Sequence, residues 1–115
     1  MKVMVIGAGR LGAKVIAQLR KNERIEIVVA DPNDRPEALR LGLIERIDIT
    51  DQLTPMNIED VVRRVRPDVI LLSRTLEDWG QNENLMGFEY VKSMERELLS
   101  IGVPVIPVCG ITFPI

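Results

Sequence analysis

The amino-acid sequence predicts an α/β protein whose doubly wound parallel sheet is covered by helices on both faces, a three-layer αβα arrangement. Two observations predict this fold class. Short apolar runs alternate with amphipathic stretches, and a glycine-rich segment joins the first apolar run to the first amphipathic stretch. A length of 115 residues, with 46% hydrophobic and 28% charged residues, suits a single domain over residues 1–115.

Three elements are expected in the first part of the chain. Lys2–Ile6 (KVMVI) is a short apolar run and predicts a buried strand. Arg10–Lys21 predicts a helix, because its apolar residues recur at helical spacing and basic residues occupy its last turn. Ile25–Ala30 (IEIVVA) predicts the second strand, and the polar residues 31–34 predict a turn.

The remaining chain continues the same alternation. Asn57 is placed to cap a helix that reaches Arg66, and Pro67 ends it. Val103–Val108 contains two prolines, which lack ladder donors, so this strand is expected at a sheet edge. The other expected elements are a short helix over Glu37–Leu41 ended by Gly42, strands over Ile47–Thr50 and Asp68–Ser73, a polar loop over Arg74–Asn84 and a long helix over Leu85–Ile101 closed by Gly102.

These elements predict about five parallel strands. With right-handed crossovers and the first strand in the centre, the expected strand order is 3-2-1-4-5. This is a Rossmann-like sheet that lacks one strand of the full dinucleotide-binding fold.

The segment Gly7-Ala8-Gly9-Arg10-Leu11-Gly12 matches the pattern G-x-G-x-x-G between a strand and a helix. In this pattern Gly7 permits a tight turn, Gly9 lets a pyrophosphate approach the backbone and Gly12 lets the helix lie close to the strand. The helix N-terminus adds N–H groups and the positive end of a dipole. The segment therefore predicts a dinucleotide site. The alternatives are a purely structural turn and a mononucleotide or coenzyme A ligand.

Further site residues are expected at the carboxyl ends of the other strands, where open α/β sheets bind ligands. Asp31 follows the second strand, where a carboxylate accepts hydrogen bonds from ribose hydroxyls and repels a 2′-phosphate. The expected cofactor is therefore NAD, with NADP and ATP as less favoured alternatives. Asp48 and the Ile49 backbone are placed to meet the adenine edge or, alternatively, form a solvated strand end. Ser73 and Arg74 follow the fourth strand, and Arg74 suits a phosphate or carboxylate.

The composition restricts the function classes. Histidine is absent, so the commonest general acid/base and metal ligand is missing, and neither catalytic nor metal-binding residues are assigned. The net charge is −2 with basic and acidic residues interspersed, and no basic tail is available to bind nucleic acid. The single cysteine, Cys109, excludes an intrachain disulfide and fits a cytoplasmic protein. No apolar run is long enough for direct membrane insertion.

Beyond these patterns, Val5–Gly12 together with Asp31 and the Asp48-Ile49-Thr50-Asp51 segment resembles the NAD-binding regulatory (KTN/RCK) domain of Trk-type potassium-uptake systems. The resemblance implies a dimerising nucleotide sensor. Arg66-Pro67-Asp68-Val69-Ile70 is instead similar to sugar-nucleotide epimerases and homoserine dehydrogenase-like oxidoreductases.

The resulting functional hypothesis is a stand-alone NAD(H)-binding regulatory module that acts through a partner protein or a homodimer. The absence of enzymatic activity is favoured over its presence. A missing sixth strand and the apolar tail Ile111–Ile115 favour the homodimer. One alternative is the cofactor-binding half of an NAD-dependent oxidoreductase completed by another chain. The other is a structural subunit without a ligand.

Overall fold

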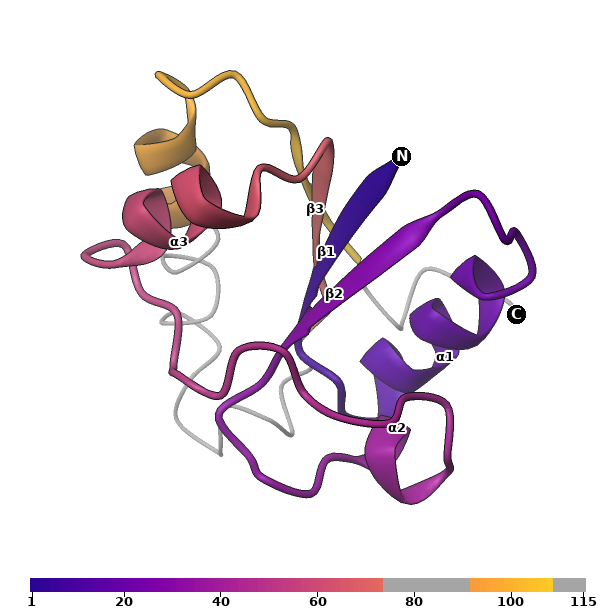
Figure 1. Ribbon diagram of the computed structural model, residues 1–115. Helices are drawn as coiled ribbons and strands as arrows, with labels where there is room; N and C mark the ends of the chain where they lie inside the picture. Colours follow the sequence, from indigo (N-terminus) through magenta and orange to yellow (C-terminus); the bar gives the residue numbers. More distant parts are fainter. Residues whose placement is uncertain (74–91, 109–115) are drawn as a thin grey trace.

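The computed structural model describes residues 1–73 and 92–108. A central parallel sheet lies between two groups of helices (Figure 1). The elements in chain order are β1 (Lys2–Ile6), α1 (Arg10–Leu19), β2 (Glu26–Ala30), α2 (Glu37–Arg40), α3 (Ile58–Val65), β3 (Val69–Leu72) and β4 (Val105–Pro107), and residues 92–98 are helical.

The sheet confirms the expected α/β class but corrects its details. The described residues form four parallel strands in the order β2-β1-β3-β4, so the expected five strands in the order 3-2-1-4-5 are wrong. β1 pairs with β2 along its whole length and with β3 from Val3 to Ile6. Among the described strands β4 lies at the edge, as the two prolines of Val103–Val108 predicted; Pro107 lies in β4 and Pro104 just before it. The central position of β1 places the turn at its carboxyl end between the ends of two neighbouring strands.

The expected third strand, Ile47–Thr50, is reduced to one bridge between Ala30 and Ile49. The Asp48 carboxylate accepts the Val29 N–H at 2.8 Å, where the carbonyl of a paired strand would otherwise accept it. The Val29 carbonyl in turn accepts the N–H groups of both Asp48 and Ile49. The Asp48 side chain takes the place of a backbone carbonyl, and the N–H groups of Asp48 and Ile49 share the Val29 carbonyl. The described residues therefore form no regular ladder beyond β2.

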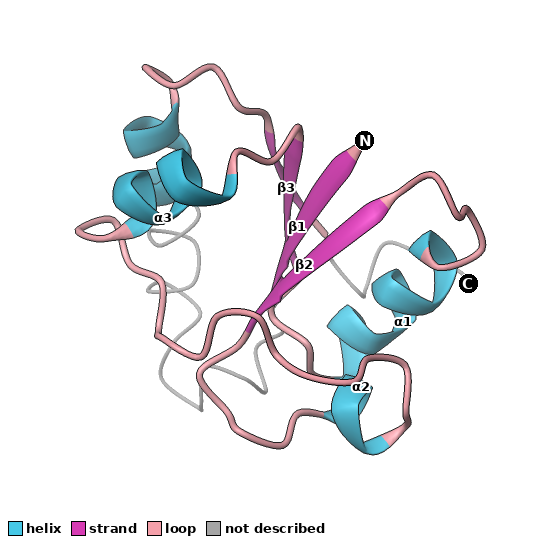
Figure 2. Cartoon of the chain, viewed as in Figure 1, coloured by secondary structure: helices cyan, strands magenta, loops and turns pink. Residues whose placement is uncertain are grey.

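Helices cover both faces of the sheet (Figure 2). On one face, α1 buries Leu11, Ala13 and Ile16. Ile16 is fully buried, and burial of such a side chain contributes about 1.5–3 kcal/mol. On the other face, α3 and the helical residues 92–98 pack on the sheet. The core of that face comprises Met4, Ile6, Ala30, Leu53, Ile58, Val61, Val62, Ile70, Leu72, Met94 and Leu98.

Helix α3 is close to its expected length, but Asn57, the residue before it, does not cap the helix in the expected way. Asn57 occupies the N-cap position without capping the helix through its side chain. Its side-chain oxygen accepts the Thr54 N–H at 2.8 Å, and its amide donates to the Gln52 carbonyl at 2.9 Å. Asn57 therefore stabilises the loop before α3, because both of its hydrogen bonds face backwards along the chain.

Candidate functional site

The glycine turn, residues 7–12, joins the carboxyl end of β1 to α1. Gly7 has a φ of 101°, a conformation that side chains disfavour, and this glycine therefore permits the sharp turn. Its N–H donates to the Ala30 carbonyl at 2.8 Å, so the turn begins hydrogen-bonded to the end of β2.

Ser73, from the end of β3, contacts the same turn on its other side. Its hydroxyl lies 2.9 Å from the Gly7 carbonyl oxygen and 3.3 Å from that of Ile6, and its side chain is fully buried. The Ser73 N–H also donates to the Ile6 carbonyl. Ser73 therefore joins β3 to the turn, and its burial leaves it no access to a ligand.

Asp31 also contacts the turn, although it was expected to contact a ribose. One carboxylate oxygen accepts the Ala8 N–H at 2.7 Å and the other accepts the Asn33 N–H at 2.8 Å. The residue is only 8% exposed. Because each carboxylate oxygen already accepts a backbone N–H, Asp31 is part of the protein's own hydrogen-bond network.

A third segment, α2, completes the contacts of the turn. The Ala38 N–H, in α2, donates to the Ala8 carbonyl at 3.0 Å. The backbone groups of Gly7 and Ala8 are thus bonded by residues from the β2 end, the β3 end and α2. A ligand at this turn is left with the backbone beyond Ala8.

The third glycine of the pattern lies against this turn. A Cβ atom placed on Gly12 would lie 2.6 Å from the Gly7 carbonyl carbon and 3.3 Å from the Ser73 hydroxyl. Real Cβ contacts do not approach backbone so closely. Gly12 therefore lets α1 begin directly beside the turn.

The first turn of α1 is the part of this region suited to an anion. The N–H groups of Leu11 and Gly12 have no acceptor within the helix, since the first N–H groups of a helix have no partner one turn earlier. Gly9 is half-buried and no acidic residue lies in the first turn. The positive end of the helix dipole adds to the attraction for a phosphate.

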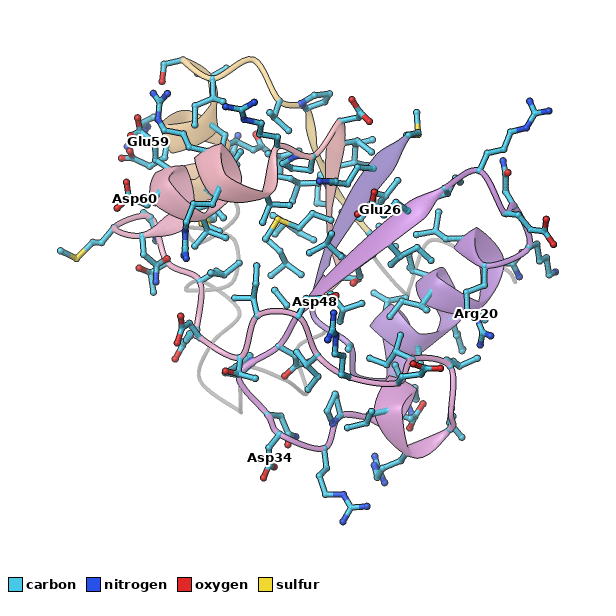
Figure 3. All side chains as sticks on the ribbon, viewed as in Figure 1. Arg20, Glu26, Asp34, Asp48, Glu59 and Asp60 are labelled. Carbon is cyan, nitrogen blue, oxygen red and sulfur yellow. The ribbon has the colours of Figure 1, made fainter. Side chains whose placement is uncertain are left out.

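Asp48 and Ile49 are bonded to the β2 side of the sheet. The Ile49 carbonyl accepts the Asp31 N–H at 3.0 Å. Asp48 lines an open depression of about 570 Å³ along the outer edge of β2, together with Arg20 beyond the end of α1. Figure 3 shows both side chains. None of residues 7–12 lines this depression.

The last expected site residue, Arg74, lies outside the described residues, together with the loop that it begins. Among residues 1–73 and 92–108, acidic and cysteine side chains form no cluster suited to a metal ion. In the same two ranges, no helix has the length and apolar character needed to span a membrane.

Two contacts in this region were missed from the sequence. The Ala38 N–H bonds to Ala8 in the turn, and the Asn33 N–H bonds to Asp31 beside it. Any residue except proline carries such a group, so no residue type in the sequence could indicate these contacts.

Comparisons with known proteins identify relatives of a different kind from those expected. No protein-family model matches the chain. Over 70 residues the chain is 37% identical to the formate-dependent phosphoribosylglycinamide formyltransferase of Ignicoccus hospitalis, a match that covers 61% of this chain and 17% of that protein. The fold is similar to that of the N5-carboxyaminoimidazole ribonucleotide synthetase from Thermotoga maritima. That similarity has a TM-score of 0.56 and 21% identity, and it covers 90% of this chain and 24% of that one.

These relatives overturn the functional expectation. Both are enzymes named for compounds that contain a phosphorylated ribose, and neither is an NAD-binding regulator or an oxidoreductase. The assignments of an NAD cofactor, a regulatory sensor and an NAD-dependent oxidoreductase half are therefore wrong. Of the resemblance to potassium-uptake regulatory domains, the parallel α/β fold is supported, and NAD binding of that type is not shown.

Proposed function

We propose that the chain is a ribonucleotide-binding domain of an enzyme related to formate-dependent phosphoribosylglycinamide formyltransferases, and that its glycine turn binds the phosphate of the phosphoribosyl group. The observation that carries this proposal is the 37% identity over 70 residues. The similarity in fold to a second enzyme of ribonucleotide chemistry supports it. Residues 1–115 would form one domain of such an enzyme, because the match spans 17% of the relative.

The site geometry suits a phosphate better than a dinucleotide. The Ala8 N–H is already bonded to Asp31, so a pyrophosphate has one donor fewer than the sequence pattern implies. The N–H groups of Leu11 and Gly12, with the dipole of α1, suit one phosphate at the helix end. The Asp31 carboxylate lies beside the turn and disfavours further negative charge there.

The proposed activity also requires a co-substrate. Condensing formate with an amine releases water, and in aqueous solution this step needs activation of the carboxylate. We propose ATP as the activating co-substrate, held by parts of the enzyme outside this sheet. The chain then has an enzymatic role as a substrate-binding domain without carrying the complete reaction centre.

Calorimetric titration with phosphoribosylglycinamide tests the proposal. We expect saturable binding at one site, with ribose 5-phosphate competing because it shares the phosphate. The matched variants are Gly9→Val and Gly9→Ala. Gly9 has a φ of −74° and a ψ of −153°, in the extended region, so neither variant places a side chain at a positive φ. The valine should weaken binding about tenfold or more because it blocks the approach to the backbone, and the alanine should weaken it less.

Two results would contradict the proposal. One is a wild-type protein that gives no heat of binding with either phosphoribosyl compound at millimolar concentration. The other is a folded Gly9→Val variant with wild-type affinity, since the ligand would then lie away from the turn. Circular dichroism spectra of both variants provide the control for folding.

A further inference from the structure

The two buried polar side chains at the glycine turn both hydrogen-bond to a single peptide group. The Ser73 hydroxyl lies 2.9 Å from the Gly7 carbonyl oxygen, and the Asp31 carboxylate lies 2.7 Å from the Ala8 nitrogen. These two atoms are the oxygen and nitrogen of the Gly7–Ala8 peptide. One side chain comes from the end of β2 and the other from the end of β3, the two neighbours of β1 in the sheet.

The orientation of this peptide matters because it sets the position of the next residue. Gly9 is the N-cap of α1, and its carbonyl accepts the Ala13 N–H at 2.7 Å. Rotation of the Gly7–Ala8 peptide would move Gly9 and therefore the N–H groups of the first helical turn. Gly7 has the conformational freedom of glycine, so sequence alone does not hold the peptide in one orientation.

We propose that Asp31 and Ser73 are positioning residues that fix the Gly7–Ala8 peptide and so orient the start of α1 toward a phosphate, without either side chain contacting the ligand. Two observations support this, because Ser73 is fully buried and each carboxylate oxygen of Asp31 already accepts a backbone N–H. The expected effect on ligand binding rests on the proposed function, whereas the hydrogen bonds to the Gly7–Ala8 peptide do not.

The two residues are expected to act unequally. The bond from Ala8 to Asp31 has a charged acceptor, which makes it stronger than a bond between neutral groups. The hydroxyl of Ser73 faces the carbonyl oxygens of both Gly7 and Ile6, so its single proton is shared between them. Loss of the carboxylate should therefore loosen the turn more than loss of the hydroxyl.

Amide hydrogen exchange by NMR tests directly whether Asp31 holds the Gly7–Ala8 peptide, and it requires no ligand. In Asp31→Ala we expect the Ala8 amide to exchange about tenfold faster or more. In Asp31→Asn the side-chain oxygen can accept only one of the two N–H groups well. We therefore expect fast exchange at Ala8 or at Asn33 but not at both. Unchanged Ala8 exchange in Asp31→Ala would refute the inference whether or not the protein binds a ligand.

Affinity for phosphoribosylglycinamide, measured well below the unfolding temperature, tests the consequence for the site. We expect Asp31→Ala and Ser73→Ala to weaken binding several-fold. The double variant should weaken it by less than the product of the two single effects, since both residues hold one peptide. Asp31→Asn should recover affinity if its Ala8 amide stays protected. Wild-type affinity in a variant with fast Ala8 exchange would reduce both residues to a role in stability alone and refute the inference.

The matched control is Asp68→Asn. The Asp68 carboxylate accepts the Lys2 N–H at 2.7 Å, a bond of the same kind at the opposite end of β1. This variant should leave both Ala8 exchange and affinity unchanged. A direct ligand contact by Asp31 would instead give weak binding with normal Ala8 exchange in Asp31→Asn, which also refutes the inference. A wild-type protein that does not bind the probe refutes the proposed function separately.

Discussion

Replacement of Gly12 by alanine is the sharpest test of how α1 is seated on the sheet. The new Cβ would overlap the Gly7 carbonyl oxygen and lie 2.6 Å from its carbonyl carbon, whereas ordinary contacts begin near 3.4 Å, so α1 must move away from the turn. Strain of this kind costs about 1–3 kcal/mol, and loss of the Ser73 bond to Gly7 adds about 1 kcal/mol. The helix preference of alanine offsets about 1 kcal/mol. The expected net loss is about 1–3 kcal/mol.

Thermal and urea unfolding measure this loss. For a domain of this size, the predicted change lowers the melting temperature by about 10 °C. Gly42→Ala is the matched control, because an added Cβ at Gly42 meets no atom within 4 Å, although its φ of 74° is unfavourable for alanine. We expect the control to lose about 1 kcal/mol from backbone strain alone.

One result would refute this reasoning. If Gly12→Ala unfolds within about 0.5 kcal/mol of the wild-type protein while Gly42→Ala loses its expected stability, α1 moves without cost. The close approach of α1 to the turn would then contribute nothing to stability, and Gly12 would need another explanation.

Two further substitutions test the core and the sheet edge. Ile16→Ala should destabilise the protein by about 2–5 kcal/mol because Ile16 is fully buried. Leu99→Ala should cost less than about 0.5 kcal/mol because Leu99 is 78% exposed. Equal losses of the two variants in urea unfolding would contradict the packing of α1. Asp48→Ala should cost about 1–3 kcal/mol and accelerate amide exchange at Val29, which loses its carboxylate acceptor; a protected Val29 amide would show that another group holds this edge.

The part of the fold that local sequence determines was predicted well. β1 has its expected bounds, and Asp68–Ser73 contains β3, because apolar runs of strand length have few ways to be buried except in a sheet. The edge position of β4 among the described strands was predicted from Pro104 and Pro107. The expected third strand failed because the Asp48 side chain, rather than a backbone carbonyl, bonds to Val29, and residue type does not reveal that exchange.

The candidate site separates local features, which the sequence predicts, from tertiary contacts, which it does not. The spacing of glycines predicted the turn between β1 and α1, because a tight turn and close packing each restrict residue size locally. The sequence could not determine what Asp31 and Ser73 contact, because their partners lie 23 and 66 residues away in the chain. Only the sheet order brings the ends of β2 and β3 to the Gly7–Ala8 peptide. The glycine pattern therefore determined the shape of a strand–turn–helix unit, and the tertiary structure decided that the Asp31 carboxylate holds this turn through the Ala8 N–H.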